Sequence, residues 1–240
     1  MTAPLRIEQK DSVWTFVLQR PDKRNALSAE LVEELLSGIE QAHAQQARLL
    51  VFRGEGPNFS AGFDFSDVDR QSDGDLLLRF VRIEMLLQAV AASPCMTLGL
   101  AHGKNFGAAV DLFAVCRRRI AADNTTFRMP GLKFGLLLGT RRFGEIVGRE
   151  RAVRIQEEAA SFDVAQAIEL GFVHAVRESD QWSDAVADEQ SIITSLDDWS
   201  RAALYRALAT SQPETDLASL VRSASRPGLR ERVRKYLSPS

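Results

Sequence analysis

Apolar and polar positions along the chain follow two different periods. Residues 6–19 are typical of two short strands around a polar turn, with apolar side chains in each half. Residues 49–54, 95–101 and 116–121 are short apolar runs, as expected of strands that are buried on both faces of a parallel sheet. The chain is therefore expected to contain a sheet with a buried centre.

Helical spacing separates these apolar runs. Residues 29–47 and 75–92 place their apolar side chains on one face, and residues 106–115 predict a short helix rich in small residues. Ser28 is a suitable N-cap for the first helix. Strands that alternate with helices indicate crossover connections, so we expect an α/β fold with a mainly parallel sheet.

The last part of the chain has a different pattern. From Glu145 onward the spacing is helical, with one strand-like break at residues 172–176. Residues 181–240 predict several helices without a sheet partner. We therefore expect an α/β core over residues 1–180, followed by a C-terminal helical region over residues 181–240.

Composition excludes several classes of protein. The 240 residues are 45% hydrophobic and 26% charged, with a formal net charge of −2, which is ordinary for a globular protein and gives no reason to expect nucleic acid as a partner. No apolar run approaches the length of a membrane span, and no signal core opens the chain, so a cytoplasmic protein without a membrane partner is expected. The two cysteines, Cys95 and Cys116, are expected to be reduced. Neither a metal-ligand spacing nor a serine-hydrolase elbow is present.

Two turns rich in small residues follow predicted strands, at residues 58–64 and 101–111. In open α/β folds, ligands bind at the carboxyl ends of the strands. The first amides of a helix have no intrahelical acceptor, and Gly107 lets a ligand oxygen approach them. The amides of Ala61 and Ala108 are therefore predicted to form an oxyanion hole, in which each donor contributes about 10²–10³ in rate.

Four motifs in this order resemble the crotonase superfamily, the enoyl-CoA hydratase/isomerase family. Residues 20–27 resemble its opening motif, residues 59–64 and 103–116 its two oxyanion segments, and residues 162–173 its Ala-x-x-x-Gly-Leu-Val helix and strand. The resemblance implies a crotonase-like spiral of β-β-α units whose C-terminal helices form a trimerisation region. It also implies a homotrimer or a hexamer, and acyl-CoA substrates in which coenzyme A is part of the substrate and no separate cofactor is needed.

The resemblance also implies roles for particular residues. It places the two oxyanion amides on Ala61 and Ala108, and the first catalytic glutamate of the hydratases on Asp111, one helical turn after Ala108. The second glutamate falls on Gly131, which cannot accept a proton. The sequence does not choose among three other carboxylates that could replace it: Asp64, Asp67 and Glu145.

The remaining candidate positions lie in or beside the same motifs. Lys23 and Arg24 are the preferred contacts for the phosphates of CoA. His102, directly before the second turn, is a weaker candidate for substrate contact. The other positions expected to contact the acyl-CoA are Ala26, Ser60, Gly62, Phe63, Asp64, Gly107 and Gly131.

These observations predict an acyl-CoA enzyme of the enoyl-CoA hydratase/isomerase type that stabilises a thioester enolate, with Asp111 moving the proton at the adjacent carbon. Alternatives on the same scaffold are an acyl-CoA decarboxylase, a thioester hydrolase and a catalytically silent acyl-CoA binder. An RNA-binding relative exists in the family, but residues 28–47 contain neither Lys nor Arg, which argues against a nucleic-acid face there.

Overall fold

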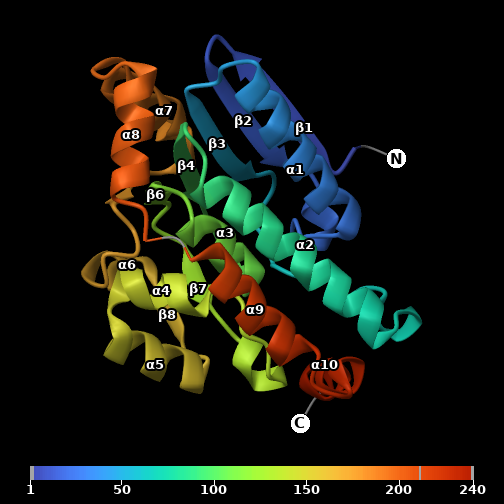
Figure 1. Ribbon diagram of the computed structural model, residues 1–240. Helices are drawn as coiled ribbons and strands as arrows, with labels where there is room; N and C mark the ends of the chain where they lie inside the picture. The colour runs from blue at the N-terminus through green and yellow to red at the C-terminus, as the bar shows by residue number, and fades with distance from the viewer. Residues whose placement is uncertain (1–2, 211, 239–240) are drawn as a thin grey trace.

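The computed structural model describes residues 3–210 and 212–238 (Figure 1). Its strands are β1 (Leu5–Lys10), β2 (Val13–Leu18), β3 (Leu49–Gly54), β4 (Met96–Ala101), β5 (Lys104–Phe106), β6 (Arg118–Ala121), β7 (Thr126–Arg128), β8 (Ser161–Asp163) and β9 (Ala175–Val176). Its helices are α1 (Ala29–Ala44), α2 (Asp73–Ala91), α3 (Ala108–Ala114), α4 (Thr140–Val147), α5 (Arg149–Glu158), α6 (Val164–Glu169), α7 (Trp182–Thr194), α8 (Asp198–Ala207), α9 (Pro213–Ala224) and α10 (Leu229–Leu237).

The larger sheet has six strands in the order β1-β2-β3-β4-β6-β9. The hairpin β1–β2 is antiparallel, and every other neighbouring pair is parallel. The predicted α/β class and the mainly parallel sheet are therefore confirmed. As predicted, α1 begins after Ser28, whose side chain accepts a hydrogen bond from the amide of Leu31 at 3.2 Å.

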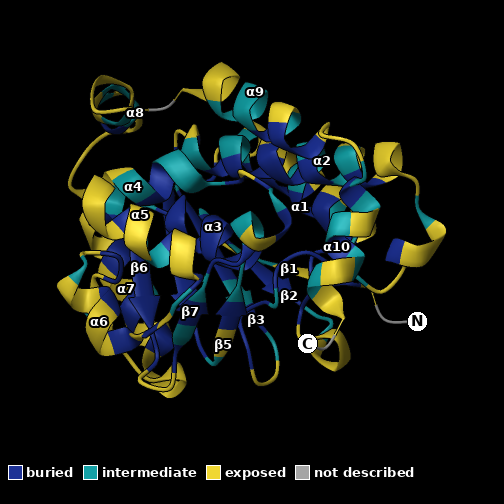
Figure 2. Cartoon of the chain, turned by 90° about the horizontal axis from the view of Figure 1, so that it is seen from below, coloured by how far each residue is buried: buried dark blue, intermediate teal, exposed yellow. Residues whose placement is uncertain are grey.

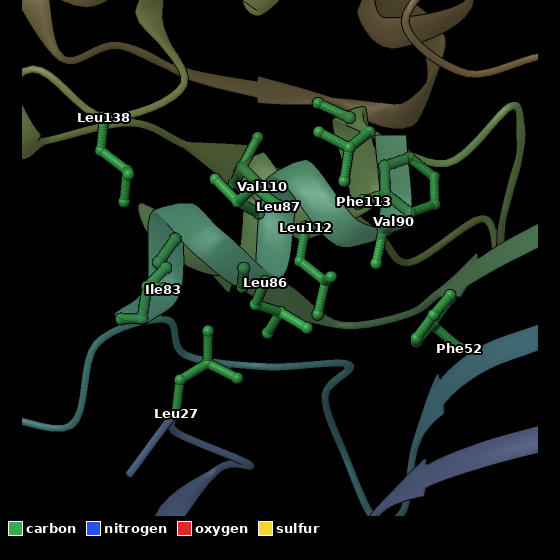
Figure 3. Packing of buried hydrophobic residues seen from close by; sticks show 14 of the residues in the cluster. Leu27, Phe52, Ile83, Leu86, Leu87, Val90, Val110, Leu112, Phe113 and Leu138 are labelled. Atoms are coloured by element: carbon green, nitrogen blue, oxygen red, sulfur yellow. The ribbon is translucent and has the colours of Figure 1, made fainter. Parts of the chain in front are cut away.

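Both faces of the larger sheet are covered, which explains its continuous apolar strands. Leu50 and Phe52 of β3 belong to the core that contains α1, α2 and α3. Figure 3 shows Phe52 with residues of α2 and α3 in this core. The alternate side chains Leu49 and Val51 pack in a second cluster, which includes Trp182 of α7. Buried positions accordingly lie throughout the central strands in Figure 2, as expected when side chains alternate between two covered faces.

A second sheet corrects the sequence-based expectation. Strands β5, β7 and β8 form a three-stranded sheet, although β5 falls inside the turn expected at residues 101–111, and only one strand-like break was expected after Glu145. Each of these strands has only three residues, too few for an apolar period to be visible. The sheet fixes the position of α3, because β5 leads directly into that helix.

The C-terminal helices divide between two parts of the fold. Helix α7 packs on the larger sheet, whereas α9 packs on α2, and α10 packs on α2 and on the 3₁₀ turn Gly131–Phe134. In that last contact the rings of Tyr236 and Phe134 lie 5.2 Å apart. The role of this region in assembly stays a prediction. No helix in the described residues is both long enough and apolar enough to span a membrane.

Candidate active site

A cavity of about 480 Å³ lies at the carboxyl ends of the strands, where both small-residue turns were expected to bind a ligand. Its walls come from β-strand ends, the turn Gly131–Phe134, α3, α5 and α10. The lining residues are Asp22, Lys23, Arg24, Ala26, Ala61, Phe63, Asp64, Phe65, Ser66, Phe80, Phe106, Gly107, Ala108, Asp111, Arg128, Met129, Pro130, Gly131, Leu132, Phe134, Leu136, Leu138, Thr140, Gln156, Tyr236 and Leu237.

Hydrogen bonds within the chain fix the conformation of the first turn. The Asn25 side chain donates to the carbonyl of Asn58 at 2.9 Å, and the Ser60 hydroxyl donates to the carbonyl of Asn25 at 2.7 Å. The Ser60 hydroxyl also accepts a hydrogen bond from the amide of Gly62 at 3.1 Å. Ser60 and Gly62 shape the turn and do not line the cavity, so their contact with substrate stays a prediction.

The amide of Ala61 is not the free donor that the sequence suggested. It donates to the carbonyl of Arg24 at 2.8 Å, although Ala61 itself lines the cavity. Two residues on, the amide of Phe63 has no hydrogen-bond acceptor among the described residues. Its neighbours are occupied: the carbonyl of Gly62 accepts from Leu27 at 2.7 Å, and the amide of the residue after Phe63 donates back to Leu27 at 3.3 Å.

The ring of Phe63 holds this segment in place. It stacks on the ring of Phe80 in α2, with 4.2 Å between the ring centroids. The guanidinium of Arg79, also in α2, lies 4.1 Å from the centroid of the Phe63 ring. Such aromatic and cation–π contacts prefer a narrow range of geometries. The orientation of the Phe63 amide is therefore set by α2 as well as by the turn.

The second turn places another free amide against the first. Gly107 has φ +50° and donates to the carbonyl of Arg128 at 2.8 Å, whereas the amide of Ala108 has no acceptor within the described part of the chain. The two turns touch each other at Gly62. A Cβ atom at Gly62 would overlap the carbonyl oxygen of Phe106 and lie 3.2 Å from the nitrogen of Ala108. Only glycine allows this approach.

Asp111 lies on the cavity wall, one helical turn beyond Ala108. Its side chain is buried, and its Oδ1 has no hydrogen-bond partner in the described residues. Burial raises the pKa of Asp111 well above its ordinary value, and Glu84 adds to this effect, while Arg142 opposes it. Gly139 leaves the room for this carboxyl, because a Cβ atom there would overlap its Oδ1. A buried carboxyl with a raised pKa beside free amides is suited to proton transfer.

A buried ion-pair network lies behind Asp111. The guanidinium of Arg142 on α4 donates to both carboxylate oxygens of Glu84 on α2, at 2.5 and 3.0 Å, and reaches Asp216 on α9 at 3.2 Å. Both members of the Glu84–Arg142 pair are buried. The network ties three helices together at the end of α4 that faces the cavity.

The sequence was compared with models of known protein families. The model of the enoyl-CoA hydratase/isomerase family matches residues 8–215. The chain belongs to the enoyl-CoA hydratase/isomerase family. The resemblance inferred from four motifs is thereby confirmed, together with the crotonase-like fold.

Relatives within the enoyl-CoA hydratase/isomerase family are similar over most of the chain. A crystal structure from Bordetella parapertussis, named as an enoyl-CoA hydratase/isomerase, is 54% identical and covers 100% of both chains with a TM-score of 0.98. "Probable enoyl-CoA hydratase echA6" of Mycobacterium bovis is 36% identical over 66% of this chain, and the match spans about 65% of that protein's length. An enoyl-CoA hydratase structure from Thermobifida fusca in complex with CoA is 25% identical, covers 97% of this chain and 95% of its own, and has a TM-score of 0.77.

Position 131 differs from the pattern of the family's hydratases. Gly131 lines the cavity at the place where the sequence resemblance puts the second catalytic glutamate of the family's hydratases. A Cβ atom there would lie 3.1 Å from the carbonyl oxygen of Leu136, so a side chain would need only a small shift of the backbone.

Of the three carboxylates suggested as replacements for the second glutamate, two are paired with other side chains and the third does not line the cavity. Burial alone would raise the pKa of Asp64, but hydrogen bonds from Ser66 and a 2.8 Å ion pair with Arg20 hold its pKa below the ordinary value. Glu145 pairs with Arg141, and neither Glu145 nor Asp67 lines the cavity.

Most of the other residues predicted to contact substrate line the cavity. Lys23, Arg24 and Ala26 line the cavity, as do Phe63, Asp64, Gly107 and Gly131. His102 does not. Its Nε2 bonds to the carbonyl of Gly56 at 2.7 Å, and its ring lies edge-on to Trp182.

The cavity residues that the sequence analysis missed include Arg128, Gln156 and Tyr236, which have large polar side chains. A signal existed for Arg128, because Phe127 and Met129 on either side of it are buried, so an alternating strand directs the arginine away from that core. Gln156 and Tyr236 lie on amphipathic helices, where a polar residue gives no sign that it faces a ligand site.

Proposed function

We propose that this protein is an acyl-CoA enzyme of the enoyl-CoA hydratase/isomerase type. The amides of Phe63 and Ala108 bind the thioester oxygen, and Asp111 moves a proton at a neighbouring carbon. One observation carries the proposal: two amides without a described acceptor, from segments that touch each other, line the same cavity as a buried carboxyl with a raised pKa.

The chemistry follows from where charge develops in the reaction. Removing a proton next to a thioester, or adding a nucleophile to its enoyl form, moves negative charge onto the thioester oxygen. Fixed donors that point at this oxygen stabilise the enolate more than the ground state, since little water competes in a buried site. Asp111 accepts the proton as a carboxylate and returns it as a neutral acid, and the burial that raises its pKa makes its carboxylate form a stronger base.

Coenzyme A belongs to the proposal as the carrier part of the substrate. The Thermobifida fusca relatives were solved with CoA and with acetoacetyl-CoA. In this chain Lys23 and Arg24 line the cavity beside the first turn and can supply charge-assisted hydrogen bonds to phosphate. No other cofactor is needed for this chemistry.

A second candidate function is decarboxylation of an acyl-CoA. Gly131 deprives the site of one acid/base group, and hydration needs both activation of water and protonation of carbon. Decarboxylation forms the same enolate by loss of CO₂ and then needs only one proton donor, a role that Asp111 can fill.

The first test measures the rate at which the purified protein converts each member of a panel of enoyl-CoA and carboxyacyl-CoA thioesters. Asp111→Asn keeps the shape of the side chain and removes the proton-transfer group, so the rate should fall by about 10²–10⁴. An Asp111→Asn variant with the wild-type rate would show that Asp111 does not transfer the proton. A preference for carboxyacyl-CoA thioesters, with release of CO₂, would favour the second candidate.

The second test addresses the amides, which side-chain substitution cannot remove. Gly62→Ala should push the two turns apart at Ala108, so the rate should fall by at least about 10² while CoA still binds. Gly228→Ala is the matched control, because its φ of +75° is close to the +78° of Gly62 and its nearest contact would be an ordinary 3.8 Å. Equal rates in the two variants would contradict an oxyanion hole at this junction.

A further inference from the structure

Gln156 of α5 is a polar side chain in an unusual position. It is only 4% exposed, it lines the cavity, and its Nε2 has no hydrogen-bond acceptor among the described residues. Leaving a buried donor without a partner is costly, so such groups in folded proteins are usually satisfied by a ligand or by ordered water. The unpartnered amide therefore points to a ligand atom.

Arg128 supplies a second donor to the same cavity wall. Its Nε donates to the carbonyl of Ala159 at 2.8 Å, three residues after Gln156 and in the same turn of chain at the end of α5. The structure describes no acceptor for its other guanidinium nitrogens. Gln156 and Arg128 thus bring a buried amide and a positive charge to one side of the cavity.

This side of the cavity adjoins the reacting end of the proposed substrate. The carbonyl of Arg128 accepts from Gly107, the residue directly before Ala108. The wall continues through position 131, and α5 is fastened to the turn there because the ammonium of Lys133 donates to the carbonyl of Glu157 at 2.8 Å. The phosphate candidate Arg24 is instead bonded to the other turn, at Ala61. The two sets of donors therefore belong to different walls.

We propose that Gln156 and Arg128 form a polar subsite for the acyl group, and that the protein prefers acyl chains carrying an oxygen acceptor, above all a terminal carboxylate. This inference rests on the proposed function, since it assumes that the cavity binds an acyl-CoA. An unsubstituted alkyl chain would bury both donors without partners. A carboxylate accepts hydrogen bonds from the amide and the guanidinium together, and charge-assisted bonds of this kind are the stronger ones.

The test compares three ligands by calorimetric titration: CoA, hexanoyl-CoA and adipyl-CoA. The two thioesters have acyl chains of six carbons, and only adipyl-CoA has a terminal carboxylate. The wild-type protein should bind adipyl-CoA at least about tenfold more tightly than hexanoyl-CoA. Gln156→Met keeps the length of the side chain and removes the amide, so it should remove most of this preference. Arg128→Met should act in the same direction.

The affinity for CoA is the internal control, because it reports whether each variant retains the rest of the site. Equal affinity of the wild type for the two thioesters would overturn the inference while leaving the proposed function intact. A loss of affinity for all three ligands in Gln156→Met would also overturn it, since that result indicates a structural role for Gln156. Failure of the wild type to bind CoA and both thioesters would instead refute the proposed function.

Discussion

Gly139→Ala tests how the fold makes room for the carboxyl of Asp111. A Cβ atom at Gly139 would overlap Oδ1 of Asp111, lie 2.5 Å from its Cγ and 3.1 Å from its Cβ. The backbone around it cannot easily give way, because Gly139 is the N-cap residue of α4 and its carbonyl accepts a hydrogen bond from the amide of Phe143 at 2.9 Å. The carboxyl must therefore move by about 1 Å or more to restore ordinary contact distances.

The size of the effect follows from two separate costs. Gly139 has φ +63°, where an alanine costs about 1–2 kcal/mol, and crowding of a packed site costs about another 1–3 kcal/mol. The rate should suffer more, because misplacing a catalytic group by about 1 Å costs about 10². Gly171→Ala is the matched control: its φ is +68°, and a Cβ atom there would meet nothing within 4 Å. It should lose only the 1–2 kcal/mol of backbone strain and keep the wild-type rate.

Both variants should be assayed for turnover of the best enoyl-CoA or carboxyacyl-CoA found in the panel, and for unfolding in urea. The reasoning predicts a large loss of rate in Gly139→Ala alone, with CoA binding retained. It is wrong if Gly139→Ala turns over substrate as fast as Gly171→Ala does, since the proposed chemistry depends on the present position of the Asp111 carboxyl.

Three further predictions concern acid/base groups and buried charge. Gly131→Glu should raise the rate of enoyl-CoA hydration by about tenfold or more by supplying a second acid/base group, whereas Gly131→Gln should not. Glu84→Ala should destabilise the protein by about 3 kcal/mol in urea unfolding, because it leaves Arg142 buried without its main partner, while Glu158→Ala in an exposed pair should cause no measurable change. Burial raises the pKa of Asp111 in the folded state, so the wild type loses stability as the pH rises above about 3.9 and through the folded-state pKa. Asp111→Asn has no such loss, so its advantage in urea unfolding should grow as the pH rises above about 4 and level off once the Asp111 carboxyl is ionised in the folded state.

The parts of the fold that the sequence predicts are those whose length shows a period. Helix α1, the six-residue strand β3 and the N-cap at Ser28 lie where the pattern placed them. Strands β5, β7 and β8 were not predicted. Each has three residues, and these residues form a strand because they pair with distant segments and not because of their local preference. Thr126, for example, pairs with Lys104 on one side and with Asp163 on the other. Non-local pairing of this kind leaves little trace in a window of sequence.

In the candidate site, too, the local sequence predicts one part and contacts with distant segments decide the rest. The motif identified the segment that carries the first donor, but the choice of amide depends on which acceptors lie nearby. A parallel bridge to Leu27 occupies the groups on either side of Phe63, and the carbonyl of Arg24 takes the amide of Ala61. Both acceptors come from a stretch more than thirty positions earlier in the chain, so no property of residues 58–64 alone distinguishes the free amide from the bonded one. The rule that buried backbone groups are paired does distinguish them, because it leaves the amide of Phe63 in need of an acceptor that the described residues do not supply. The thioester oxygen of an acyl-CoA is the acceptor that the proposed function provides.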